Sequence, residues 1–77
     1  MSIAFVLVHV EAGTEKDTII ELKQLERVEE IYELYEPYDI IVKVVAENEA
    51  KLKELVSDRI RKMDSIYSMG TMIVIES

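Results

Sequence analysis

The 77-residue sequence contains no cysteine and only one histidine, His9. Without cysteine the chain can form neither disulfide bonds nor thiolate metal or redox centres, and one histidine cannot supply a histidine-rich metal site. We therefore predict no metal and no cofactor. A chain of this length forms one domain, residues 1–77, and buries only about 60–65% of its unfolded surface. We expect the missing stabilisation to come from partner chains.

Positive charge is also scarce, with 9 Lys and Arg against 16 Asp and Glu and a formal net charge of −7. Phosphate backbones bind to concentrated basic surfaces. The one basic cluster, Arg59, Arg61 and Lys62, stands beside Asp58 and Asp64. We interpret it as a solvated helix end, where cations interact favourably with the helix dipole. The sequence thus predicts no direct binding to nucleic acid.

Long hydrophobic runs are absent as well. The apolar stretch over residues 3–10 has no basic residue before it and ends at Glu11. A signal peptide needs a positive leader, and a membrane span needs about 20 apolar residues. We expect no membrane insertion and a cytoplasmic location.

The patterns that are present predict alternating strands and helices. Residues 3–10 are short and β-branched, which is typical of a buried strand. Apolar residues at helical spacing predict a helix over residues 14–26, with Thr14 as N-cap and Asp17 completing an approximate capping box. Residues 38–46 alternate an apolar face with a mixed one and predict the clearest strand.

A second helix is predicted to begin at Asn48 as its N-cap. Its amphipathic stripe consists of Leu52, Leu55, Val56, Arg59, Ile60 and Met63. Arg59 on that stripe is expected to extend its charged end to solvent. Residues 66–75 predict the last strand. Residues 28–36 could form a helix or a strand, and the spacing of their apolar side chains alone favours a helix.

If residues 28–36 form a strand, this order indicates an α+β, ferredoxin-like βαββαβ fold, a four-stranded antiparallel sheet with two helices on one face. The first strand is apolar on both faces, so the uncovered face would expose roughly 500–600 Å² of apolar surface, near the limit for monomers. Burying it yields on the order of 12–15 kcal/mol gross, against an association cost of about 4–15 kcal/mol. We predict a homodimer formed through this uncovered face.

Three segments together resemble a known family: "EPYDIIVKV" (36–44), "IRKM" (60–63) and "SMGTMIVI" (68–75). In their order and spacing they are similar to the ligand-binding domain of Lrp/AsnC transcription regulators, also called the RAM domain, which has a βαββαβ pattern. The resemblance covers the whole chain. It assigns roughly residues 29–36 to a strand, and on that ground we favour a strand over the helix that periodicity suggests.

The resemblance implies a stand-alone RAM protein without the family's DNA-reading helix-turn-helix, and no enzymatic activity. It implies an amino-acid effector, dimers that assemble into larger rings such as an octamer or decamer, and association with full-length Lrp/AsnC regulators. The protein would then modulate transcription regulation or amino-acid metabolism through assembly.

The same resemblance places effectors between dimers, near the turn before the third strand and the start of the fourth. The family's Tyr-Asp pair matches Tyr38 and Asp39, and its strand-four threonine matches Thr71. Two features depart from the family pattern: Glu36, followed by proline, replaces a common glycine, and Met69 replaces the first threonine of a Thr-x-Thr pattern.

Residue chemistry points to the same kind of ligand. A free amino acid presents an ammonium and a carboxylate that each need a partner once desolvated. Asp39 can accept from the ammonium, while backbone N–H groups over Ser68, Met69 and Gly70 can donate to the carboxylate, since glycine permits close approach. Tyr38 and Thr71 would add hydroxyls, and the Met69 side chain would line a pocket.

Other interpretations remain open. Asp39 can equally serve as a turn cap, and Tyr32, Tyr35 and Tyr67 can be interface aromatics. One alternative function is a small cofactor-free dimeric α+β barrel enzyme, oxygenase-like, in which His9 and a tyrosine line an enclosed cavity. Another is a purely structural oligomerisation partner of full-length regulators that binds no effector.

Overall fold

A computed structural model describes residues 1–75. Its elements are β1 (Ser2–Val10), α1 (Glu15–Lys23), β2 (Val28–Glu33), β3 (Ile40–Ala46), α2 (Glu49–Leu55), the π-helical turn η1 (Val56–Ile60), which continues α2, and β4 (Ile66–Ile73). The predicted βαββαβ order is confirmed, including the second strand, where hydrophobic periodicity alone favours a helix.

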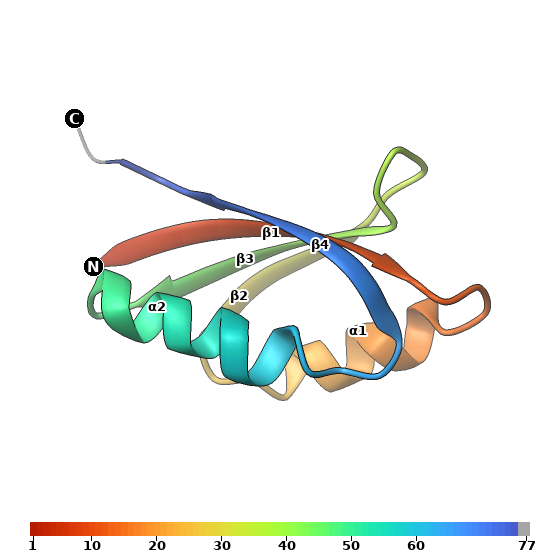
Figure 1. Cartoon of the computed structure of the whole chain (residues 1–77), viewed down its shortest axis with the longest axis horizontal. Helices are drawn as coiled ribbons and strands as arrows, with labels where there is room; N and C mark the ends of the chain where they lie inside the picture. The colour runs from red at the N-terminus through yellow and green to blue at the C-terminus, as the bar shows by residue number, and fades with distance from the viewer. Residues whose placement is uncertain (76–77) are drawn as a thin grey trace.

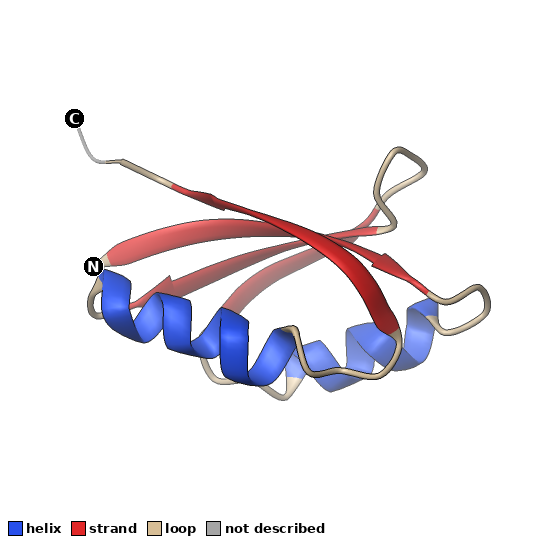
Figure 2. Cartoon of the chain, viewed as in Figure 1, coloured by secondary structure: helices blue, strands red, loops and turns tan. Residues whose placement is uncertain are grey.

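The strands form one antiparallel sheet in the order β2-β3-β1-β4. Both helices lie against the same face of this sheet, and the opposite face is uncovered (Figures 1 and 2). This is the ferredoxin-like arrangement that the sequence predicts. Within residues 1–75, no helix is long and apolar enough to cross a membrane.

Alternate residues of the two central strands point into the helix layer, as the two-residue period of a strand requires. The fully buried side chains between sheet and helices include Ala4, Val6, Val8, Ile40, Val42, Val44 and Ala46 from β1 and β3, with Thr18, Leu22, Leu52 and Ile60 from the helical segments. The core therefore lies on one side of the sheet.

The opposite face, which we call the open face, is apolar at its centre. β1 contributes Ile3, Phe5 and Leu7, all only partly buried. Phe5 lies opposite Lys43 of β3 and Met72 of β4, so side chains from three strands share this surface. Met72 is 53% exposed. This is the face through which we predict dimerisation.

β2 contains one residue more than the stretch of β3 opposite it. Val28 pairs with Val44 and Glu30 with Lys43, which leaves Glu29 as the extra residue of a β-bulge. A bulge shifts side-chain alternation by one. Val28 and Ile31 consequently share the helix-covered face although they are three residues apart, and this spacing is the reason that the segment imitates a helix in sequence.

The first helix is shorter than the predicted 14–26. The Thr14 hydroxyl donates to the Glu11 carbonyl oxygen at 2.6 Å instead of accepting from the first helical turn, so the predicted capping box is absent. At the other end the Gln24 amide donates to the Glu21 carbonyl oxygen at 3.2 Å. This three-residue bond tightens the last turn and ends the helix early.

The second helix begins as predicted, because the Asn48 side chain accepts a hydrogen bond from the Lys51 amide at 2.9 Å. Two strand boundaries differ from the predictions. β3 begins at Ile40 rather than at residue 38, and β4 ends at Ile73 rather than at residue 75. Ile75 is 90% exposed, so the apolar character of the last residues does not extend the strand.

Candidate functional site

Asp39 lies immediately before β3 and is held by its backbone on two sides. Its amide donates to the Val8 carbonyl oxygen at 3.0 Å, and its carbonyl oxygen accepts from the Leu34 amide at 2.7 Å. The first bond ties the residue to β1, and the second closes the loop that joins β2 to β3. In Figure 1 this loop extends from the sheet on the side away from the helices.

The Asp39 carboxylate reaches across to the end of β1. Its Oδ2 accepts a hydrogen bond from the Val10 amide at 2.9 Å and lies 3.7 Å from His9 Nδ1. The pairing of β1 with β4 changes register between these two β1 residues. The carboxylate therefore satisfies a backbone donor where the strand ladder is irregular, which is a structural cap on β1 rather than on the turn itself.

The other carboxylate oxygen of Asp39 accepts no hydrogen bond from residues 1–75. The side chain is 32% exposed. A carboxylate offers about four lone-pair sites. Asp39 thus keeps accepting capacity for a ligand while it holds β1.

His9 lies between two tyrosine rings on the open face. Its ring centroid is 4.5 Å from that of Tyr38 and 5.8 Å from that of Tyr67, with interplanar angles of 23° and 17°. Offset-stacked rings at such separations attract one another. The stack joins the loop before β3 to β1 and β4. In this single chain His9 belongs to a packed row of rings on a sheet face and not to an enclosed cavity.

Tyr38 also explains the glycine on β4. A Cβ added at Gly70 would lie 3.3 Å from Tyr38 Oη, closer than side-chain carbons normally approach. Gly70 pairs with Leu7, so it faces the open side of the sheet beneath the tyrosine. The glycine is a point of close packing, as glycine within a strand often is.

The structure separates the predicted site residues into two groups. Tyr38 and Asp39 lie beside His9, and both Ser68, which pairs with His9, and Gly70 share their side of the sheet. Met69 and Thr71 pair with Val8 and Val6, which places them on the helix-covered side. In one chain, the hydroxyls of Tyr38 and Thr71 therefore lie on opposite faces.

An open cavity of about 630 Å³ adjoins Asp39. Its lining consists of Val10, Glu11, Ala12, Glu15, Asp39 and Tyr67. A neighbouring groove of about 350 Å³ shares Tyr67 and adds Arg61, Ile66, Ser68 and Met69. One hollow is thus lined by three carboxylates and the other by a guanidinium. No group of three His, Asp or Glu side chains within residues 1–75 is arranged to hold a metal ion.

The sequence does not mark four residues that line the two hollows as ligand contacts: Glu11, Glu15, Tyr67 and Arg61. Glu11 and Glu15 join the site because β1 ends beside the loop that carries Asp39. From the sequence, Arg61 is expected only to be part of a solvated helix end. One pattern that could have indicated this grouping is the run Arg61 to Ser68, which leads from the helix directly into the strand that carries the predicted ligand contacts.

Three pKa values are shifted elsewhere, at the β2 side of the open face. Lys43 Nζ lies 3.1 Å from Glu29 and 3.4 Å from Glu30. The hydrogen bond to Glu29 raises the pKa of Lys43, while the bond from Tyr32 and then that from Lys43 lower the pKa of Glu30. The Glu30 carboxylate also raises the pKa of Tyr32. This cluster stabilises the sheet edge and is not part of the Asp39 site.

Comparison with known proteins identifies the family. The model of the Lrp/AsnC ligand binding domain matches residues 3–77. Among curated proteins, none matches the chain. The solved structure of FFRP-DM1 is 37% identical, with a TM-score of 0.94, and the match covers 97% of this chain and 100% of that one.

Larger regulators share the fold. Escherichia coli AsnC is 25% identical with a TM-score of 0.90, over 99% of this chain and 52% of that one. A regulator from Neisseria meningitidis, solved as a complex with L-Met, is 13% identical with a TM-score of 0.87, over 97% of this chain and 50% of that one. The present chain spans about half the length of these two regulators. With the family model matched over residues 3–77, the chain belongs to the Lrp/AsnC ligand-binding domain family.

Proposed function

We propose that this protein is an effector-binding module that takes a free amino acid beside Asp39. The observation that carries the proposal is that only one of the two carboxylate oxygens of Asp39 is hydrogen-bonded within the chain as described. Oδ2 is engaged by the Val10 amide, while the second oxygen accepts no bond from residues 1–75 and the side chain lines the 630 Å³ cavity. An anionic acceptor that is already fixed in position suits an ammonium ion, because little ordering is needed when the ligand binds.

Two neighbouring hollows match the two charges of a free amino acid. Asp39, with Glu11 and Glu15 near it, supplies acceptors for the ammonium. On the other side of Tyr67, Arg61 and the backbone of β4 supply donors for the carboxylate. β4 is an edge strand, so part of its N–H groups are free of strand partners. Arg61 replaces Thr71 in this proposal, since Arg61 lines the groove that shares Tyr67 and Thr71 does not.

The family supports the ligand class. The matching family model describes a ligand-binding domain, and a regulator of the same fold was solved as a complex with L-Met. That regulator is only 13% identical, so its ligand supports an amino acid as the class and leaves the side chain undetermined.

Assembly is the proposed output of binding. Two copies associate through the open face, and dimers then meet in a larger ring with the Asp39 site at their contact. An effector that completes its pocket only between dimers favours the assembled state, because ligand stabilises the state that binds it. We propose that the module acts in this way in the cytoplasm, with itself or with full-length Lrp/AsnC regulators, and so modulates transcription.

Thermal-shift measurements against the twenty amino acids test the proposal. A ligand of ~100 μM affinity supplied at ~10 mM stabilises its binding state by roughly 2.7 kcal/mol, which is readily observed. Asp39→Asn then separates the two roles of the carboxylate. Asparagine keeps an oxygen that can accept from the Val10 amide but removes the negative charge, so we expect calorimetry to show lost amino-acid binding in a protein that remains folded and dimeric.

Asp58→Asn is the matched control, since it removes an equal charge from an exposed residue of η1. If Asp39→Asn and the parent bind the amino acid equally, the carboxylate is only a cap and the proposed site is wrong. If no amino acid binds while the protein mixes with a full-length regulator, the structural-partner alternative is favoured. An enclosed cavity around His9 in the dimer, with turnover of a substrate, would instead favour the enzyme.

A further inference from the structure

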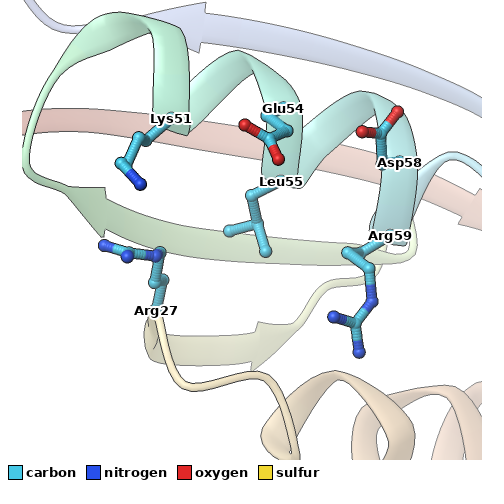
Figure 3. A pocket seen from close by; sticks show the side chains of 6 residues that line it. All are labelled: Arg27, Lys51, Glu54, Leu55, Asp58 and Arg59. Atoms are coloured by element: carbon cyan, nitrogen blue, oxygen red, sulfur yellow. The ribbon is translucent and has the colours of Figure 1, made fainter.

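A groove on the helix side of the molecule gathers cations that the Asp39 site does not use. It has a volume of about 200 Å³ and is lined by Arg27, Lys51, Glu54, Leu55, Asp58 and Arg59. Figure 3 shows Lys51, Leu55 and Arg59 extending from the helix towards the side on which Arg27 stands, while the carboxylates of Glu54 and Asp58 stay at the helix, away from Arg27. The cationic side chains therefore border the groove from both walls.

These three cations are free of ion pairs within the chain as described. No carboxylate oxygen of residues 1–75 lies within 4.0 Å of a side-chain nitrogen of Arg27, Lys51 or Arg59. The same is true of four other cations of the described chain, so what distinguishes these three is that they line one groove. The net charge is −7, so carboxylates to neutralise them are abundant elsewhere. Three of nine Lys and Arg residues thus line one groove together with two carboxylates, Glu54 and Asp58, which leaves the lining with one excess positive charge.

The backbone that carries these side chains is fixed. The Arg27 carbonyl oxygen accepts from the Val45 amide at 3.0 Å, which anchors the loop before β2 to β3. Lys51, Leu55 and Arg59 are four residues apart in turn, so they follow one row along α2 and η1. The Arg61 amide donates to the Val56 carbonyl oxygen at 2.9 Å, which makes η1 a π turn. Such turns occur frequently at functional sites.

We propose that this groove binds a small organic anion with two or more negative charges, carried by phosphate or carboxylate groups. Guanidinium forks suit both groups, since each can accept two parallel N–H bonds. Leu55, half-buried between the cations, offers an apolar contact for the carbon part of the ligand. A volume of about 200 Å³ lies below the usual range for larger ligands, and the net charge of −7 repels long polyanions.

Isothermal titration of the intact protein with pyrophosphate and with tricarballylate at low salt tests the groove. We expect at least one of the two to bind, and the tighter of the two identifies the phosphate or the carboxylate class. Removing a guanidinium should weaken binding roughly 10- to 150-fold, the effect of losing a charge-assisted hydrogen bond. The variants are Arg27→Gln and Arg59→Gln, with Lys51→Gln as a third because its side chain is exposed and its loss does not threaten the fold.

Lys53→Gln is the control, because it removes the same charge from the same helix at a residue that pairs with Glu49 outside the groove. Glu54→Gln should change the affinity in the opposite direction. It removes a carboxylate that repels the anion from the rim, so the anion should bind roughly 1.4- to 5-fold more tightly. Failure of both anions to bind overturns the proposal, and so does an equal weakening by Lys53→Gln and the groove variants. Amino-acid binding at Asp39 should be unchanged in all of them, so failure here leaves the proposed function intact.

Discussion

The two faces of the sheet are built by alternate residues of the same strands, yet they differ in what completes them. Val6 is fully buried beneath the helices, whereas its neighbour Leu7 is only partly buried on the open face. The helix side carries an apolar core supplied by the chain itself. The open side combines an apolar centre with the charged cluster of Glu29, Glu30 and Lys43 at β2. The difference indicates that the chain covers one face with its own helices and leaves the other face uncovered.

A charge placed on the helix-covered face should produce the largest effect. Val6→Asp buries a carboxylate that has no partner, at a cost of about 3–5 kcal/mol or more. That approaches the whole stability expected of a small domain. We expect circular dichroism to show an unfolded or aggregated protein. A cooperatively folded Val6→Asp variant would contradict the assignment of this face to the core.

The same charge at the next residue, Leu7, should leave the fold intact and prevent dimerisation. Leu7→Asp places its carboxylate on the open face, where the isolated chain keeps it in contact with water. Two such faces brought together would bury like charges opposite each other. We expect light scattering after gel filtration to show a folded monomer at micromolar concentration. A Leu7→Asp protein that remains dimeric would exclude the open face as the dimer interface.

A smaller effect should follow from Gly70→Ala, which tests the contact between the tyrosine and β4. The new methyl group would meet Tyr38 Oη at 3.3 Å. We expect a destabilisation of about 0.5–1 kcal/mol in urea unfolding, and relief of most of it in the Tyr38→Phe background, because the hydroxyl is removed. Additive effects of the two substitutions would show that the contact does not form.

The smallest effect concerns acid stability at the β2 edge. The Tyr32 hydroxyl and Lys43 lower the pKa of Glu30, so the folded state favours its ionised form. Its contribution is present above the ordinary glutamate pKa of about 4.3 and is lost as pH falls through the lowered value. Urea midpoints at a fixed protein concentration should therefore fall less steeply below that pH in Glu30→Gln than in the parent.

Glu26→Gln, at an exposed residue that pairs with no cation among residues 1–75, is the matched control for this titration. We expect the urea midpoint of Glu26→Gln to fall with decreasing pH as steeply as that of the parent. If the urea midpoint depends on pH equally in Glu30→Gln and in the parent, the cluster does not contribute to the pH dependence of stability.

The apolar periods of the sequence were sufficient to predict β1, β3 and the second helix, because these elements have regular periods. The apolar spacing was misleading at β2. The two-residue alternation of a strand requires that each residue pairs with one residue of its neighbour. The bulge at Glu29 inserts an extra residue and shifts that alternation. The resemblance to a family, and not local physics, identified the strand there.

The placement of the candidate site residues was predictable in part for a related reason. Asp39 stands out because it is a carboxylate at the mouth of a strand, and the resemblance adds Tyr38; in the structure Asp39 lines a cavity and Tyr38 stacks on His9. The face on which Thr71 lies depends on its pairing with Val6, and the bond from Val10 to Asp39 joins residues 29 apart in sequence. Such contacts follow from sheet register, which the local sequence of either strand does not specify.

The bulge in β2 also determines how the chain tolerates a change in length. Val28 pairs with Val44 and Glu30 with Lys43, so removing Glu29 would bring two residues together whose partners are already adjacent. The ladder would become continuous, and Val28 and Ile31 would keep their places against the helices. The loss would be confined to one exposed ion pair, between Glu29 and Lys43. A one-residue deletion, which in a regular strand turns side chains to the wrong face, is here expected to preserve the fold.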